Sequence, residues 1–182
     1  MAYIERKLFT LNTGHAITAY FGYLKGYKTI DESIKDEVIY DFVKKAMIES
    51  GQGLIAKYNF DEEAHLKYID KIIGRFKNPY LKDDVARVGR EPLRKLNEND
   101  RLIKPLITAR GFNIKTDSLL LGVGAALHYD NKEDAQSREL QSLIHEKGIR
   151  GSIAEISKIS EDTDVLDKIE KYYDEVKKLI GA

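Results

Sequence analysis

The chain has 182 residues, and its 30 basic and 30 acidic side chains cancel, so the whole molecule has no electrostatic preference for nucleic acid or an anionic membrane. It has no cysteine, which excludes disulfides, thiolate metal sites and a cysteine nucleophile. The amino terminus lacks the apolar run of a secretory signal, and no apolar stretch approaches the roughly 20 residues that span a bilayer. We therefore expect a cytoplasmic protein with no membrane partner.

Helical periodicity runs through nearly the whole sequence, and the three prolines all fall in the middle of the chain. The first predicted helix covers about 8–24, and Gly26 is placed to end it. A second helix opens at the capping-box pair Thr29 and Glu32, continues through Met47 and is weakened by two glycines, Gly51 and Gly53.

The remaining helices follow in the same way. A third helix starts at about Asp61, and 75–104 is predicted to form short helices joined by turns, because prolines and paired charges interrupt the pattern. Later helices are expected at 102–108, 119–129, 139–144, 149–159 and 164–180. The predicted fold is an all-α, multi-helix single domain over residues 1–182.

The glycine pattern LLLGVGAAL at 119–127 suggests a dinucleotide-binding loop, but we reject that interpretation. Such a loop needs a preceding strand and a third glycine, and the sequence indicates neither. Small residues that let two helices pack closely are the better explanation. The usual means of binding NAD is therefore not expected in this chain.

Three polar residues interrupt the apolar first helix in the segment KLFTLNTGHAITAY: Lys7, Asn12 and His15. Asn12 and His15 are three apart and emerge on one helix face, whereas Lys7 lies one or two turns earlier. Such residues either satisfy one another inside the core or face a polar cavity, and the first is the commoner case. The remaining histidines, His65 among them, have no partner spacing and are expected to fill core or surface.

The spacing K-x4-N-x2-H in that segment resembles the catalytic signature of the polyol-specific long-chain dehydrogenases. The string GRFKNPYLKDDVARVGREPLRKLNENDRLIKP at 74–105 resembles the second signature of the mannitol-1-phosphate 5-dehydrogenase branch of that family. The resemblance implies a helical carboxy-terminal domain similar to that of 6-phosphogluconate dehydrogenase. It also implies that an amino-terminal Rossmann domain, absent from this chain, binds NAD, so we expect the isolated domain to be inactive.

The resemblance also implies roles for residues. Lys7 matches the family's catalytic lysine, the general base that takes the hydroxyl proton as hydride leaves carbon 5 of mannitol 1-phosphate for NAD, giving fructose 6-phosphate. Asn12 and His15 match its polar partners, which stabilise charge on the reacting oxygen. The family uses no catalytic metal, and the chain has no H-E-x-x-H spacing.

A phosphorylated substrate requires a basic site, and residues 75–104 carry nine basic against five acidic side chains. The candidates for substrate and phosphate binding are Arg75, Asn78, Lys82, Arg87, Arg90 and Arg94. Most single charges of this kind are solvated or paired at the surface.

Two other interpretations stay open. The chain could be a helical module that binds phosphorylated ligands or nucleic acid through 75–104, or a structural interaction domain. Neither accounts for both signature strings.

Overall fold

The computed structural model describes residues 2–159 and 163–180, which form a stack of helices joined by turns and loops. Within those ranges the only β-structure is an isolated bridge between Thr29 and Asp84, so the all-α prediction is confirmed. The elements are α1 Ala2–Lys7, the π-helix η1 Leu8–Asn12, α2 Thr13–Leu24, α3 Ile30–Lys35, α4 Glu37–Tyr58, α5 Glu62–Phe76, the 3-10 helix η2 Pro79–Leu81, α6 Val85–Gly89, α7 Pro92–Lys95, α8 Ile103–Gly111, α9 Asp117–Leu127, α10 Ala135–Ser157 and α11 Thr163–Leu179.

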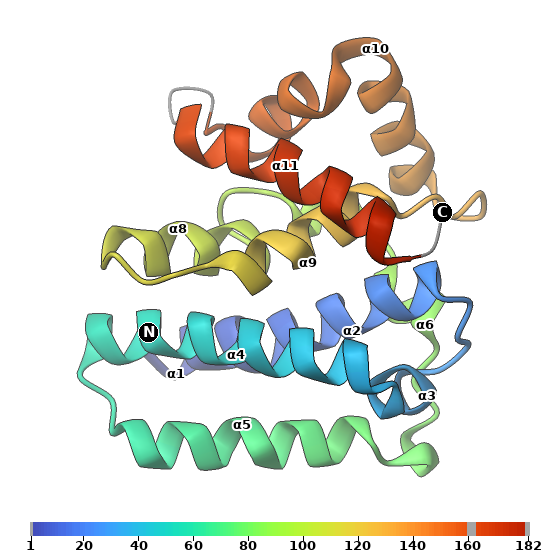
Figure 1. The fold of residues 1–182 in the computed structure, drawn as a ribbon. Helices are drawn as coiled ribbons and strands as arrows, with labels where there is room; N and C mark the ends of the chain where they lie inside the picture. Colours follow the sequence, from blue (N-terminus) through green and yellow to red (C-terminus); the bar gives the residue numbers. More distant parts are fainter. Residues whose placement is uncertain (1, 160–162, 181–182) are drawn as a thin grey trace.

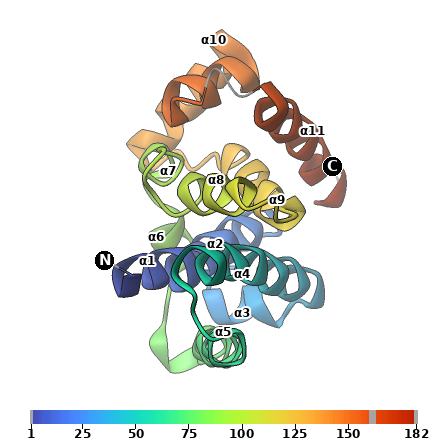
Figure 2. The ribbon, with the colours of Figure 1, turned by 90° about the vertical axis from the view of Figure 1, so that its left-hand side faces the viewer.

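The helices form layers with α9 at the centre (Figures 1 and 2). Helix α5 lies on one outer side, followed by a layer that contains α2 and α4, then α8 and α9, and finally α10 and α11. Every residue of α9 from Ser118 to Leu127 is buried, because α2 and α4 pack on one side of it and α11 on the other. A helix that is apolar all round, as this one is, needs neighbours on both sides.

Capping residues set the helix starts as the sequence predicted, with one correction. Thr29 and Glu32 form the capping box at the start of α3, and the Asp61 carboxylate accepts the Ala64 N–H at 2.6 Å at the start of α5. The single helix predicted from Thr29 through Met47 is wrong. The chain breaks at Asp36, whose backbone is extended and whose carboxylate caps a new helix, α4.

The prediction that Gly51 and Gly53 weaken the end of the second helix is also wrong. Helix α4 continues past both to Tyr58. A Cβ atom on Gly51 would lie 2.7 Å from the ring of His65, and one on Gly53 would lie 3.2 Å from the Ala109 backbone. These glycines therefore allow α5 and α8 to approach α4 closely.

The two glycines of LLLGVGAAL lie inside α9 and pack against other helices, as predicted. A Cβ on Gly122 would lie 2.6 Å from the side chain of Ile17 in α2. A Cβ on Gly124 would lie 2.9 Å from the backbone oxygen of Tyr172 in α11. Both glycines are in contact with protein, so neither is available to approach a pyrophosphate group.

Candidate functional site

A π-helical turn follows Lys7 and ends at Asn12. Helix α1 ends at Lys7, the π-helix η1 covers Leu8–Asn12, and α2 continues from Thr13 without a break. The Thr13 N–H bonds to the carbonyl of Leu8, five residues back. Short π-helical turns inside α-helices occur frequently at functional sites.

The turn accounts for the K-x4-N spacing of the signature. At about 100° per residue, an α-helix would place Lys7 and Asn12 roughly 140° apart around the axis. In a π-helix the hydrogen bond joins residues five apart, so residues at that spacing are about one turn apart and share a face, as residues four apart do in an α-helix. The turn therefore brings Lys7 to the same side of the helix as Asn12, and His15 follows three residues later on that side.

Lys7 and Asn12 are accessible from solvent. Lys7 is exposed and Asn12 is half-buried. Neither side chain forms a hydrogen bond or ion pair with another residue in the described parts of the chain, so both are free to contact a ligand. Neither residue lines the cavity beside His15.

His15 joins the signature segment to the polar loop before α6. Its ring stacks on Phe76 with centroids 5.0 Å apart, and its Nε2 lies 3.1 Å from Oδ2 of Asp83, without hydrogen-bond alignment. Burial lowers the pKa of His15, the Asp83 carboxylate opposes that change, and the cations Arg87 and Arg101 add to it. The imidazole is therefore neutral at neutral pH and can act as a hydrogen-bonding group.

A cavity of about 150 Å³ lies beside His15, and we call it the basic cavity because of the residues that line it. It is lined by His15, Arg87, Val88, Arg90, Arg94, Lys95 and Arg101. Five of these residues carry a positive charge, and no carboxylate is among them. An uncharged ligand would gain little from such a lining, whereas an anion would neutralise it.

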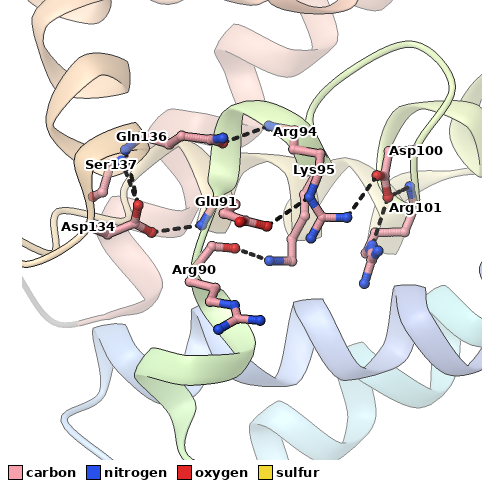
Figure 3. Close-up of polar contacts among 9 residues, drawn as sticks. All are labelled: Arg90, Glu91, Arg94, Lys95, Asp100, Arg101, Asp134, Gln136 and Ser137. Atoms are coloured by element: carbon pink, nitrogen blue, oxygen red, sulfur yellow. Dashed lines mark hydrogen bonds and ion pairs between the residues drawn. The ribbon is translucent and has the colours of Figure 1, made fainter.

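The carboxylates that pair with these cations lie around the cavity. Arg87 pairs with Asp83, and Arg101 Nε lies 2.7 Å from Asp100. Arg94 donates to Glu91 at 2.9 Å. Among the described residues Arg90 has no such partner, and Figure 3 shows its guanidinium beneath the α6–α7 segment with no polar contact drawn.

Lys95 is a member of the cavity that the sequence prediction missed. Its side chain is 2% exposed, and its Nζ donates to the carbonyl oxygen of Arg90. Burial, together with the nearby cations Arg101 and Arg94, lowers the pKa of Lys95 to about 8. Arg101 was missed as well. The sequence offered no signal that distinguishes these two from the other basic residues of 75–104.

The α6–α7 connection that carries these cations is held by α10 (Figure 3). Glu91 has a left-handed backbone with φ of 60°, and its N–H donates to Oδ2 of Asp134 at 2.7 Å. The Arg94 N–H donates to Gln136 at 3.0 Å. Asp134 also caps α10 by accepting the Gln136 N–H, so one carboxylate connects the start of α10 to the cavity.

The six predicted substrate-binding residues divide into two groups. Arg87, Arg90 and Arg94 line the basic cavity with His15. Three others do not line it: Arg75, Asn78 and Lys82. All three are exposed. Arg75 lies in the last turn of α5, whereas Asn78 and Lys82 lie between α5 and α6, where the Asn78 side chain caps η2 by accepting the Tyr80 N–H.

The described residues hold neither a membrane-spanning helix nor a cluster of metal ligands. No helix in 2–159 or 163–180 is both long and apolar enough to cross a bilayer. No three His, Asp or Glu side chains of those ranges gather in a way that could hold a metal ion.

A comparison with a family model identifies the family, and two solved structures share the fold. The model of the mannitol dehydrogenase C-terminal domain matches residues 1–177. A solved structure of Pseudomonas fluorescens mannitol 2-dehydrogenase, a ternary complex with NAD and D-mannitol, superposes with a TM-score of 0.78 at 19% identity. A substrate-free D-sorbitol dehydrogenase superposes with a TM-score of 0.74 at 16% identity.

In both cases the match covers 98% of this chain and 39% of the other. At these identities the likeness concerns the fold, and the chain corresponds to a minor part of each enzyme's length. Because the family model spans nearly all of the sequence, this chain belongs to the mannitol dehydrogenase family, as its C-terminal domain.

Proposed function

We propose that this domain supplies the substrate site and proton-transfer groups of an NAD-dependent dehydrogenase that interconverts mannitol 1-phosphate and fructose 6-phosphate. The basic cavity beside His15 is the observation that supports a phosphorylated substrate over a free polyol. Its five cations include Arg90, which has no carboxylate partner among the described residues. A dianionic phosphate would give this guanidinium a bidentate partner.

The size of the cavity supports a site shared between two domains. At about 150 Å³ it is well below the roughly 300 Å³ at which ligand pockets usually begin. Lys7 and Asn12 lie outside it and are accessible. In this proposal the phosphate occupies the cavity, the polyol extends toward Lys7, and an N-terminal NAD-binding domain covers the remainder.

The signature residues would divide the chemistry between them. Lys7 Nζ accepts the proton of the reacting hydroxyl, and the Asn12 amide donates a hydrogen bond to the same oxygen. His15, kept neutral by burial and held against Phe76, provides a further donor. Removing one such donor typically raises the barrier by ~3 kcal/mol.

The glycines of α9 are packed against Ile17 and Tyr172, so they do not offer a dinucleotide-binding loop. NAD would therefore be held mainly by the N-terminal domain, and it supplies the hydride acceptor when bound. The part of the chemistry assigned to this chain is to position the substrate and to remove its hydroxyl proton.

Steady-state kinetics of the full-length enzyme, with NAD and either mannitol 1-phosphate or mannitol, test this proposal. We expect a strong preference for the phosphorylated substrate. Arg90→Ala should raise KM for mannitol 1-phosphate by about 10- to 100-fold, because a hydrogen bond to a charged group contributes roughly 1.5 to 3 kcal/mol. KM for mannitol should change little.

Arg138→Ala is the matched control, because Arg138 is exposed on α10 and does not line the basic cavity. It should leave KM for mannitol 1-phosphate and KM for mannitol unchanged. Equal use of the two substrates by the wild-type enzyme, with no selective effect of Arg90→Ala, would reject the phosphate assignment.

A further inference from the structure

We propose that Thr13 and Ser50 are positioning residues. Their hydroxyl groups hold the π-helical turn Leu8–Asn12 and thereby fix the direction in which Lys7 projects. The inference rests on the proposed function, since it assigns these hydroxyls a role through the proposed base. Neither residue lines the basic cavity, and neither belongs to the signature triad.

The turn requires support from outside the helix. Residues 2–24 are helical throughout, and a continuous α-helix is the local alternative to a π-helical turn. Single π-helical turns are rare, and an interruption of this kind in a helix has an identifiable cause. That cause should be visible as side-chain contacts to the backbone of Leu8–Asn12.

Thr13 provides the first contact. Its side chain is fully buried, and its Oγ1 lies 3.0 Å from the carbonyl oxygen of Leu8 and 2.7 Å from that of Arg101. The hydroxyl thus joins the turn to a residue that lines the basic cavity. A change to α-helix would move the Thr13 N–H from Leu8 to Phe9, and the hydroxyl would turn with it and lose its buried partners.

Ser50 on α4 provides the second contact. Its Oγ donates to the carbonyl oxygen of Phe9 at 2.7 Å, and both groups are buried. In an α-helix this carbonyl would accept the Thr13 N–H, which in the π-helical turn bonds to Leu8 instead. Ser50 therefore gives Phe9 the partner that the turn removes from it.

The consequence concerns Lys7. If the extra residue of the π-helical turn were absorbed into an α-helix, the part of the helix before it would rotate by about 100° relative to Asn12 and His15. The lysine amine would then leave the face that carries the other two signature residues. Misplacement of a catalytic group by about 1 Å can reduce the rate about 100-fold.

The experiment compares Thr13→Val, Thr13→Ser and Ser50→Ala in the full-length enzyme, with Thr18→Val as the matched control. Thr18 is buried in the same helix and donates to Gly14 at 2.7 Å, but it does not contact the turn. We expect Thr13→Val and Ser50→Ala to lower kcat by about 100-fold, with KM for mannitol 1-phosphate within about threefold. Thr13→Ser should restore kcat, and Thr18→Val should leave it unchanged.

Crystal structures of the same variants provide a readout that does not depend on activity. Loss of the π-helical turn in Thr13→Val and Ser50→Ala supports the inference. Persistence of the turn in both, or an equal loss of kcat in Thr18→Val, overturns it. If Thr13→Val does not fold, Ser50→Ala decides the question.

Lys7→Ala separates this inference from the proposed function. If the turn is lost with kcat unchanged while Lys7→Ala is inactive, the positioning role is rejected and the proposed base is retained. Near-normal turnover of Lys7→Ala rejects the base, and the crystal structures alone then decide whether the two hydroxyls hold the turn.

Discussion

Helix α2 packs against α9 on one side and borders the basic cavity on another. The first side contributes to folding, and the second carries the proposed function. Toward α9 its contacts are apolar and close, with Ile17 filling the space over Gly122. Toward residues 83–101 it presents His15 to a basic cavity lined by charged side chains. Regular helices form the first side. Short helices form the second side, and hydrogen bonds to the start of α10 hold their backbone.

The two sides are stabilised in different ways. At the α9 contacts, stability comes from excluded water and close packing, which residues of the right size and polarity provide. At the cavity, Glu91 has a positive φ, and its position depends on the carboxylate of Asp134, 43 residues later in the chain. Packing should therefore control stability, and polar contacts should control ligand affinity.

The largest effect on stability is expected at the packed side. Gly124→Ala would place a Cβ atom 2.9 Å from the Tyr172 backbone oxygen, which cannot rotate away as a side chain could. We expect the free energy of unfolding to fall by about 3 kcal/mol, which urea denaturation would measure.

Gly74→Ala makes the same substitution in α5, at a position where an added Cβ meets nothing within 4 Å. It should stabilise the protein by about 0.5 to 1 kcal/mol. Similar destabilisation by both substitutions would mean that close packing at α9 is not the determinant.

An intermediate effect is expected at Glu5, a charged group buried among packed helices. Its carboxylate accepts from Lys57 at 2.8 Å, Tyr58 at 2.6 Å and Lys104 at 2.8 Å. Burial alone would raise the pKa of Glu5, but the hydrogen bonds from Lys104, Lys57 and Tyr58 outweigh it and lower the pKa to about 2. The ionised carboxylate therefore stabilises the folded state.

Because its pKa is lowered on folding, the contribution of Glu5 is complete above about pH 4.5 and is lost as the pH falls toward 2. Glu5→Gln should reduce the free energy of unfolding by about 2 kcal/mol at pH 7, a value discounted because its two lysine partners are about one third exposed. The difference from wild type should shrink below pH 4.5.

Glu63→Gln is the control for Glu5→Gln, since Glu63 pairs with Lys67 while both side chains are more than 70% exposed. It should change stability by less than about 0.5 kcal/mol. A difference between Glu5→Gln and wild type that does not depend on pH would contradict the electrostatic account.

The smallest effect on stability, with the most specific effect on function, is expected at Asp134. Asp134→Ala removes the cap of α10 and the acceptor of the Glu91 N–H, so it should cost about 1 kcal/mol of stability. It should also raise KM for mannitol 1-phosphate in the full-length enzyme, because the segment that carries Arg90 and Arg94 loses its anchor.

Asp61→Ala removes an equivalent cap at the start of α5, where the carboxylate accepts the Ala64 N–H and does not contact the cavity. It should lower stability by a similar amount and leave KM unchanged. Matching KM values in the two variants would show that α10 does not position the cavity.

The sequence by itself determined the helical class, the helix starts at Thr29 and Asp61, and the packing role of the glycines in 119–127. These features depend on residues a few positions apart, where side-chain chemistry and helical periodicity act directly. The sequence also selected Lys7, Asn12 and His15, although their proposed roles rest on resemblance to a family.

Only the tertiary structure decided which basic residues share a cavity with His15. Lys95 and Arg101 line it and Arg75 and Lys82 do not, because the fold anchors the α6–α7 connection to Asp134, 43 residues after Glu91 in the chain. Likewise, no local preference specifies the π-helical turn before Thr13. The Thr13 hydroxyl bonds to the carbonyl of Arg101, 88 positions away, and only the folded chain brings such groups together.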